Sequence, residues 1–189
     1  MNIFFLDRDP VAAAKMHCDK HLSKMCIEYA QLLSTAHRVV DGVVTSVPSK
    51  SGRRMIHRHI HPDQDKNERL YLDTHVNHPS NKWSRESSKH YLWLYQLYVA
   101  LCEEFEYRYN KPHGSSKLSD ILAVPPAGLD LISYWVDPPL AMKSAPNIIE
   151  NKTLTAVEAY RQFYHTKQGR FKMVWTKRES PKWWKGNLT

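Results

Sequence analysis

The sequence has little glycine, and its cysteines do not form a spaced pair. Six of the 189 residues are glycine, which disfavours a hairpin-rich β fold and a glycine-rich loop that would cradle phosphates. The cysteines are odd in number and lack a CxxC motif, so we expect reduced thiols packed in helices. They are Cys18, Cys26 and Cys102.

No stretch of the sequence is apolar over the length that a membrane span or a signal peptide requires. The apolar run at residues 1–6 leads at once into Asp7, Arg8 and Asp9. We therefore expect a cytoplasmic protein that has no membrane partner. No motif in the sequence indicates a cofactor, and none is expected.

The sequence has fewer acidic than basic residues. The chain has 19 Asp and Glu against 27 Lys and Arg, a formal net charge of +8. This balance favours a polyanionic partner, and DNA or a nucleotide is the first candidate because phosphates attract cationic side chains. The length fits one domain around a single core, so residues 1–189 are expected to form one domain, with a monomer favoured.

Apolar residues at helical spacing predict two long helices. Asp9 followed by Pro10 is a helix-start signal, and the first helix is expected to run to about Val40 and stop near Gly42. The second is expected from about Asn81 to Tyr109.

The remaining segments predict shorter helices and loops. Helices are expected at 116–122 and 155–168, a mobile basic loop at about 43–67, a proline-rich loop at 124–146, and a basic aromatic C-terminal arm at about 171–189. The expected fold class is all-α, a single compact domain of two long helices plus shorter helices and irregular Pro-rich loops.

Five polar side chains of the first helix follow one another at alternating steps of four and three, so they stack on one face. We call them the polar row: His17, His21, Lys24, Glu28 and Gln31. An acid, two imidazoles, an amine and an amide beside an apolar stripe are typical of a pocket wall. A solvated face would more often carry interchangeable Glu and Lys. The alternative is that these histidines are structural.

Glu28 is the best catalytic candidate in the polar row. It lies mid-helix beside Met25, Tyr29 and Leu32, and a partly desolvated carboxylate suits general acid/base chemistry. The alternative is a structural Glu28 that pairs with Lys24 or a histidine.

A second polar group precedes the second long helix. His75 and His78 are three residues apart, and Trp83 and Arg85 follow. Basic side chains at a helix N-terminus predict a site for phosphate, and so for a nucleotide or DNA. Alternatively, His75 and His78 bind a metal together with histidines of the polar row, as in a metal-dependent hydrolase. The spacing matches no zinc signature, so no metal ligand is assigned.

The C-terminal arm interleaves aromatic and cationic side chains, among them Lys182, Trp183 and Trp184. Such a surface stacks on exposed bases while its charges hold the nucleic-acid backbone. The alternative is that the tryptophans cover the helical core.

Short motifs in the first helix resemble a known family. Asp19-Lys20-His21-Leu22, followed by Ile27-Glu28-Tyr29, resembles the first helix of the phage-type pyrimidine-dimer DNA glycosylases, also called endonuclease V. That family has an Asp-x-His-Leu step and a catalytic Glu at the matching distance. The long aromatic middle helix and the segment Pro181-Lys182-Trp183-Trp184 are also similar, and together these parts cover about half of the chain.

The resemblance implies an all-α glycosylase that bends DNA and extrudes a nucleotide. Members of the family use the N-terminal α-amino group as the nucleophile at sugar C1′, and a Glu that assists imine formation and β-elimination. Met1 and Glu28 would take these two parts here, with His21 as the histidine near the Glu. Two departures stand out: Asn2 hinders removal of Met1, and Ile27 and Gln31 stand where the family has arginines. Either the substrate differs, or the lyase step is lost.

The expectation is therefore a DNA glycosylase-like enzyme that acts at the N-glycosidic bond of a damaged or modified pyrimidine nucleotide. It would work in the host cytoplasm if a phage encodes it. Two alternatives remain open: a non-catalytic nucleic-acid-binding accessory protein of a phage, and the histidine-based metal-dependent hydrolase.

Overall fold

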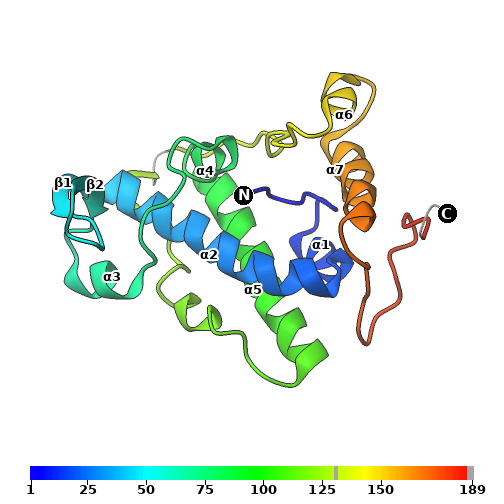
Figure 1. Cartoon of the computed structure of the whole chain (residues 1–189), viewed down its shortest axis with the longest axis horizontal. Coiled ribbons are helices and arrows are strands. Elements are labelled where there is room, and N and C mark those ends of the chain that lie inside the picture. The colour runs from blue at the N-terminus through cyan, green and yellow to red at the C-terminus, as the bar shows by residue number, and fades with distance from the viewer. Residues whose placement is uncertain (130–131, 187–189) are drawn as a thin grey trace.

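The structure, a computed structural model, describes residues 1–129 and 132–186. Its centre is a pair of long helices, α2 (Asp19–Asp41) and α5 (Ser88–Tyr109), which pack against each other. Figure 1 shows the two helices crossing, with α1 (Pro10–Met16) and α7 (Ala156–His165) grouped at one end of the molecule. The apolar stripe of α2, including Leu22, is buried, as its period predicted.

The first residues of the chain run inside the molecule. Residues 3–6 are all buried, and the Phe4 amide donates to the Tyr29 hydroxyl of α2 over 2.9 Å. Burial of each large apolar side chain contributes about 2 kcal/mol, which anchors the segment. The start of the chain is therefore held near α4 (Pro79–Ser84), where the Ser80 hydroxyl donates to the Met1 carbonyl over 3.4 Å.

The first predicted helix begins and ends where expected. Asp9 caps α1 by accepting from the Val11 amide, and α2 ends at Asp41. At Gly42 an added Cβ would stand 2.2 Å from the Arg38 carbonyl oxygen. Only glycine fits so close an approach.

The prediction of one continuous helix is wrong, because His17 and Cys18 are extended and separate α1 from α2. The backbone groups that a helix would have paired find tertiary partners here. The Cys18 amide donates to the Tyr164 hydroxyl, and Arg108 donates to the carbonyls of Lys15 and His17. These partners satisfy the groups that the break leaves unpaired.

The second predicted helix is also interrupted. It divides into α4 and α5 at residues 85–87. Ser87 caps α5 by accepting from the Lys89 amide, and its hydroxyl donates to the Tyr134 carbonyl. The end at Tyr109 is confirmed, because Asn110 adopts the left-handed conformation that terminates helices.

The expected all-α fold class and the expected loop at 43–67 are both wrong. Strand β1 (Val43–Pro48) pairs antiparallel with β2 (Met55–Ile60), and α3 (Gln64–Arg69) follows. The molecule is mostly helical with a small sheet, which lies at the far end of α2 from α7 (Figure 1). The β-branched side chains of β1 favour a strand, and Gly52 supplies the positive φ of the turn.

Buried Arg38 fastens this small sheet to α2. Its guanidinium donates to the backbone carbonyls of His59, Leu70 and Tyr71. Five donors in a rigid fork suit Arg to this work. The hairpin thus depends on contacts made elsewhere in the chain, and its own residues gave only a weak signal.

The rest of the chain is mostly irregular. The helix expected at 116–122 reduces to the 3₁₀ turn η1 (Ser116–Leu118), and the proline-rich segment holds a second turn, η2 (Ala127–Leu129). The last predicted helix is confirmed as α7 followed by η3 (Thr166–Gly169), and α6 (Pro146–Glu150) was not predicted. The described part of the arm, 171–186, has no regular structure.

The cysteines and the helices agree with two further expectations over the described residues. The three cysteines form no disulfide and are buried; Cys26 and Cys102 lie in helices, whereas Cys18 is the extended residue before α2. No helix in the described ranges has the length and apolar character needed to cross a membrane. Positions 130–131 of the proline-rich loop and 187–189 of the arm lie outside the described residues.

Candidate active site

A cavity of 240 Å³, which we call the N-terminal cavity, lies beside the N-terminal half of α2. Its wall comes from three parts of the chain: the buried N-terminal segment, α2, and the residues just after α7. The lining residues are Met1, Asn2, Phe4, His21, Lys24, Met25, Glu28, Lys167, Arg170 and Phe171.

A second cavity of 700 Å³, the adjoining cavity, shares part of this wall. Met1, Asn2, Lys167 and Arg170 line both cavities. The adjoining cavity adds residues 77–79 at the start of α4 and the 141–144 loop. The start of the chain thus lies where the two cavities meet.

Glu28 faces the N-terminal cavity and pairs with Lys24. One carboxylate oxygen of Glu28 lies 3.1 Å from the Lys24 Nζ; the Glu28 side chain is 15% exposed and that of Lys24 63%. The pair is an i,i+4 contact on α2, and one largely exposed partner makes it weak in energy. Glu28 therefore keeps a carboxylate at the cavity wall without being locked in a strong ion pair.

His21 lies in the cavity wall as an uncharged ring. It stacks on Phe4 with ring centroids 4.6 Å apart, and its buried Nδ1 has no hydrogen-bond partner among the described residues. Burial, followed by the positive charges of nearby His17 and Lys167, lowers the pKa of His21 to about 3. His21 is thus a neutral ring near neutral pH: it can pass a proton from one ring nitrogen to the other, but it does not carry a positive charge there.

His17 does not belong to the cavity, although the helical spacing predicted it. Its ring is fully buried, and Nδ1 donates to the Ala13 carbonyl over 2.7 Å. Burial lowers its pKa to about 4. The break before α2 separates His17 from the rest of the polar row, so its role is structural.

His78 connects the adjoining cavity to the N-terminal amine. As the N-cap of α4, its Nδ1 accepts from the Ser80 amide. Burial lowers the pKa of His78, the positive charges of the Met1 amine, His75 and Lys143 lower it further, and the negative charge of Glu28 raises it. The Met1 amine and the Glu28 carboxylate are therefore both close enough to the His78 imidazole to change its pKa.

Lys167 and Arg170 were missed by the sequence reasoning. They follow α7 and line both cavities. Their only signal in the sequence is two basic residues three apart in 167–170. Together with the Met1 amine and Lys24 they give the cavity wall a strongly basic character against one carboxylate, Glu28, which suits a substrate that carries phosphate.

Two of the predicted DNA contacts, Trp83 and Arg85, make contacts within the fold. Trp83 is buried, stacks on His90 and donates to the Val136 carbonyl. Arg85 donates to the Asn81 side chain and the Val76 carbonyl, and burial lowers its pKa. Neither side chain lines either of the two cavities.

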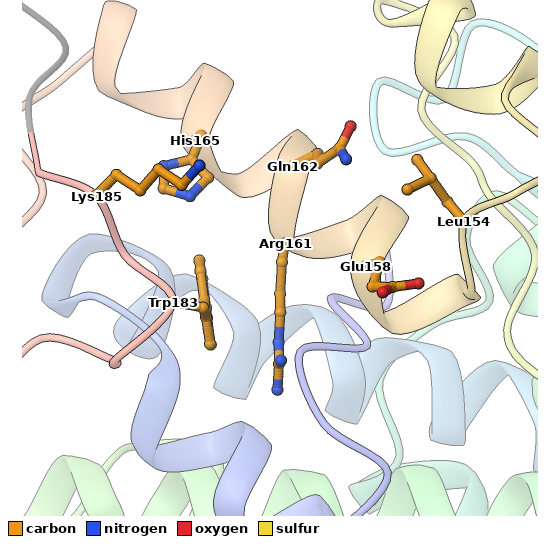
Figure 2. Close-up of a pocket in the computed structure, with 7 residues that line it drawn as sticks. All are labelled: Leu154, Glu158, Arg161, Gln162, His165, Trp183 and Lys185. Atoms are coloured by element: carbon orange, nitrogen blue, oxygen red, sulfur yellow. The ribbon is translucent and has the colours of Figure 1, made fainter.

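The C-terminal arm packs on α7. Arg161 of α7 and Trp183 of the arm both line a separate cavity of 560 Å³, and Figure 2 shows their side chains side by side. The guanidinium of Arg161 lies 5.5 Å from the Trp183 ring centroid and also donates to the Leu6 carbonyl. Trp184 stacks on His165 with centroids 4.6 Å apart. The two tryptophans thus cover the helical core, and only Lys182 of the three predicted arm residues is exposed.

One group of side chains in the described residues has the arrangement of metal ligands: His37, Asp41 and His61, whose ligand atoms lie within 4.8 Å of one another. The Asp63 amide donates to Nδ1 of His61 over 3.1 Å, so the neutral ring carries its proton on Nε2, the atom that would bind the metal. Asp41 meanwhile accepts from the amides of Ala127 and Gly128. We therefore assign no metal here.

The histidines of the predicted hydrolase site do not form such a group within the described ranges. His17 is buried in the core, whereas His75 is exposed at a positive φ and bonds with Thr74.

The structure thus brings together five of the predicted residues at the two cavities and leaves the others elsewhere. Those at the cavities are Met1, His21, Lys24, Glu28 and His78. Those that line neither are His17, Gln31, His75, Trp83, Arg85, Lys182, Trp183 and Trp184. Comparison of the chain with family models, curated proteins and solved structures finds no match.

Proposed function

We propose that the protein is a DNA glycosylase-like enzyme that cleaves the N-glycosidic bond of a damaged or modified pyrimidine nucleotide. One observation carries the proposal: Met1, Glu28 and His21 line the same cavity. An amine, a carboxylate and an uncharged imidazole in one cavity are the groups that amine-dependent base release needs. The burial of residues 3–6 supports it further, because a fixed segment holds the Met1 amine in place.

In this reaction the Met1 α-amino nitrogen forms a bond to sugar C1′ as the bond from C1′ to the base breaks. The base leaves with the bonding electron pair and takes one amine proton. The sugar ring then opens, O4′ takes the other amine proton, and an imine joins C1′ to Met1. Glu28 stabilises the positive charge that develops at C1′, and His21 relays protons beside it.

The basic wall supports a substrate that carries phosphate. Lys167 and Arg170 flank the Met1 position in both cavities, and cationic side chains hold the phosphates beside the reacting sugar. A flipped nucleotide needs a pocket, and the adjoining cavity of 700 Å³, with apolar Met142 and Phe163 in its wall, has the size and lining for a base.

Borohydride trapping tests the proposal. The protein is incubated with duplexes that each carry one damaged or modified pyrimidine, and free base is measured by chromatography. Borohydride is then added, and the covalent protein–DNA adduct is mapped by mass spectrometry. We expect base release together with an adduct at Met1, which acetylation of the α-amino group abolishes.

The outcomes separate the possible reactions. Base release without any adduct would indicate that a water activated by Glu28, and not the Met1 amine, attacks C1′. The N-glycosidic assignment would stand. If no substrate of the panel gave base or adduct, the glycosylase assignment would be wrong. That result would favour the alternative of a nucleic-acid-binding protein without catalysis.

A further inference from the structure

Lys167 is a buried lysine in an unusual place. The residue is 9% exposed, and its Nζ lies 3.4 Å from the centroid of the Phe163 ring. It lines both the N-terminal and the adjoining cavity. Lysine is rarely buried unless its ammonium group is paired, so the charges around Lys167 decide which protonation state it adopts.

Within residues 1–129 and 132–186 no carboxylate forms an ion pair with Lys167. The neighbouring charges are of the same sign. Burial, followed by the positive charges of Arg170 and Lys24, lowers the pKa of Lys167 to about 8. Both effects disfavour the ammonium form and oppose the cation–π contact with Phe163, which favours it.

The consequence is a nucleophile at physiological pH. With a pKa of about 8, a substantial fraction of the Lys167 side chains are neutral amines near pH 7.5, whereas an ordinary lysine is almost fully charged there. A neutral lysine amine in a desolvated pocket is the form that attacks carbonyl carbon.

The geometry points to Lys167 as a second catalytic amine of this site, one that forms an imine with a sugar aldehyde carrying a neighbouring phosphate. This inference rests on the position of Lys167, which lines both cavities. Met1 and Arg170 also line both, and Glu28 lines the N-terminal cavity. The identity of the natural aldehyde, an abasic sugar in its ring-opened form, rests on the proposed function.

The step balances without an external reagent. The Lys167 amine adds to the aldehyde carbon at C1′, and the carbonyl oxygen becomes a hydroxyl. The hydroxyl, which has already taken one proton from the amine, takes the second and leaves as water. A carbon–nitrogen double bond remains between C1′ and Lys167. Glu28 carries the proton from the nitrogen to the departing oxygen. Arg170 holds the phosphate of the bound sugar.

A small probe tests Lys167 without any DNA. Pyridoxal 5′-phosphate carries both an aldehyde and a phosphate, and borohydride fixes its imine for mapping by mass spectrometry. At pH 7.5 we expect Lys167 to be labelled at least about tenfold faster than exposed Lys152, with a rate that rises through pH 8. Lys167→Arg and Lys167→Met should remove this label, while the matched control Lys152→Arg should keep it.

Equal labelling of Lys167 and Lys152, without the inflection near pH 8, would overturn the inference. Circular dichroism melts establish that each variant is folded. If Lys167→Arg were unfolded, the wild-type labelling rates would still decide the question.

A duplex with a single abasic site then tests catalysis, again with borohydride. An adduct mapped to Lys167, and lost in Lys167→Met, supports the catalytic role. An adduct at Met1 alone, unchanged in Lys167→Met, overturns that role and leaves the proposed function standing. Fast probe labelling at Lys167 without any adduct to abasic DNA, and without base release from the duplexes that carry a damaged or modified pyrimidine, supports the reactive lysine and contradicts the proposed function.

Discussion

Replacement of Glu28 by glutamine tests whether this residue acts in the chemical step, because the substitution should change the rate of base release far more than the free energy of unfolding. The Glu28→Gln substitution keeps the size of the side chain but removes the group that ionises. The ion pair lost is the 3.1 Å contact with Lys24, whose side chain is 63% exposed. Such an i,i+4 pair contributes about 0.3–0.5 kcal/mol, so the free energy of unfolding should fall by less than about 1 kcal/mol.

Activity should respond far more strongly. A positioned acid/base group contributes about 10²- to 10⁴-fold in rate, which corresponds to about 3–5 kcal/mol of transition-state stabilisation. The measurements are single-turnover base release on the best substrate and urea unfolding of the same preparation. We expect release to fall by at least about a hundredfold while the unfolding midpoint hardly moves.

Glu103→Gln is the matched control, because Glu103 is an exposed carboxylate on α5 that lines neither cavity. It should leave base release unchanged. Turnover of the Glu28→Gln variant within a few-fold of wild type would refute the argument that this carboxylate carries the chemistry. Equal losses in both variants would do the same, since they would point to a general effect of charge.

Three further results are expected. Burial lowers the pKa of His17 to about 4 and of His21 to about 3, so only the unfolded chain binds these protons just below pH 6.5. Urea unfolding should thus show stability falling between about pH 6.5 and 5 by about 1 kcal/mol per pH unit for each ring, and a flat profile would contradict this. Arg108→Met removes one partner of buried Glu104, which keeps Arg178, and leaves the Lys15 and His17 carbonyls without their donor; it should cost about 2–3 kcal/mol in the same assay, whereas a loss below about 1 kcal/mol would show that these contacts are dispensable. Arg170→Ala should reduce the slope of log affinity for abasic DNA against log salt by about 1, and an unchanged slope would place Arg170 away from the phosphates.

The candidate site was partly predictable, because its central residues share one helix. His21, Lys24 and Glu28 lie within about two turns of α2, where a spacing of three and four residues fixes which side chains share a face. The same rule failed for His17. Its position depends on the extended break before α2, and that break depends on Arg108 and Tyr164, which lie far along the chain.

Lys167 and Arg170 were not predictable by such local rules. They reach the cavities because the segment after α7 returns to the N-terminus, where Lys167 packs on Phe163. The tryptophans of the arm show the converse. An aromatic and basic segment predicts a surface that stacks on bases, but Trp184 stacks on His165 and covers the core instead. Composition does not specify which partner a side chain meets.

Features that depend on neighbours within a few residues could be predicted from the order of the amino acids. These are the Asp9 cap, the end of α2 before Gly42, the apolar stripe and the face that carries Glu28. The two helix breaks, the β1–β2 hairpin held by Arg38, and the meeting of Met1, Glu28 and Lys167 at one cavity depend on the folded molecule. Each of these needs a hydrogen-bond or packing partner that is distant in the chain, and such partners are brought together only when the core forms.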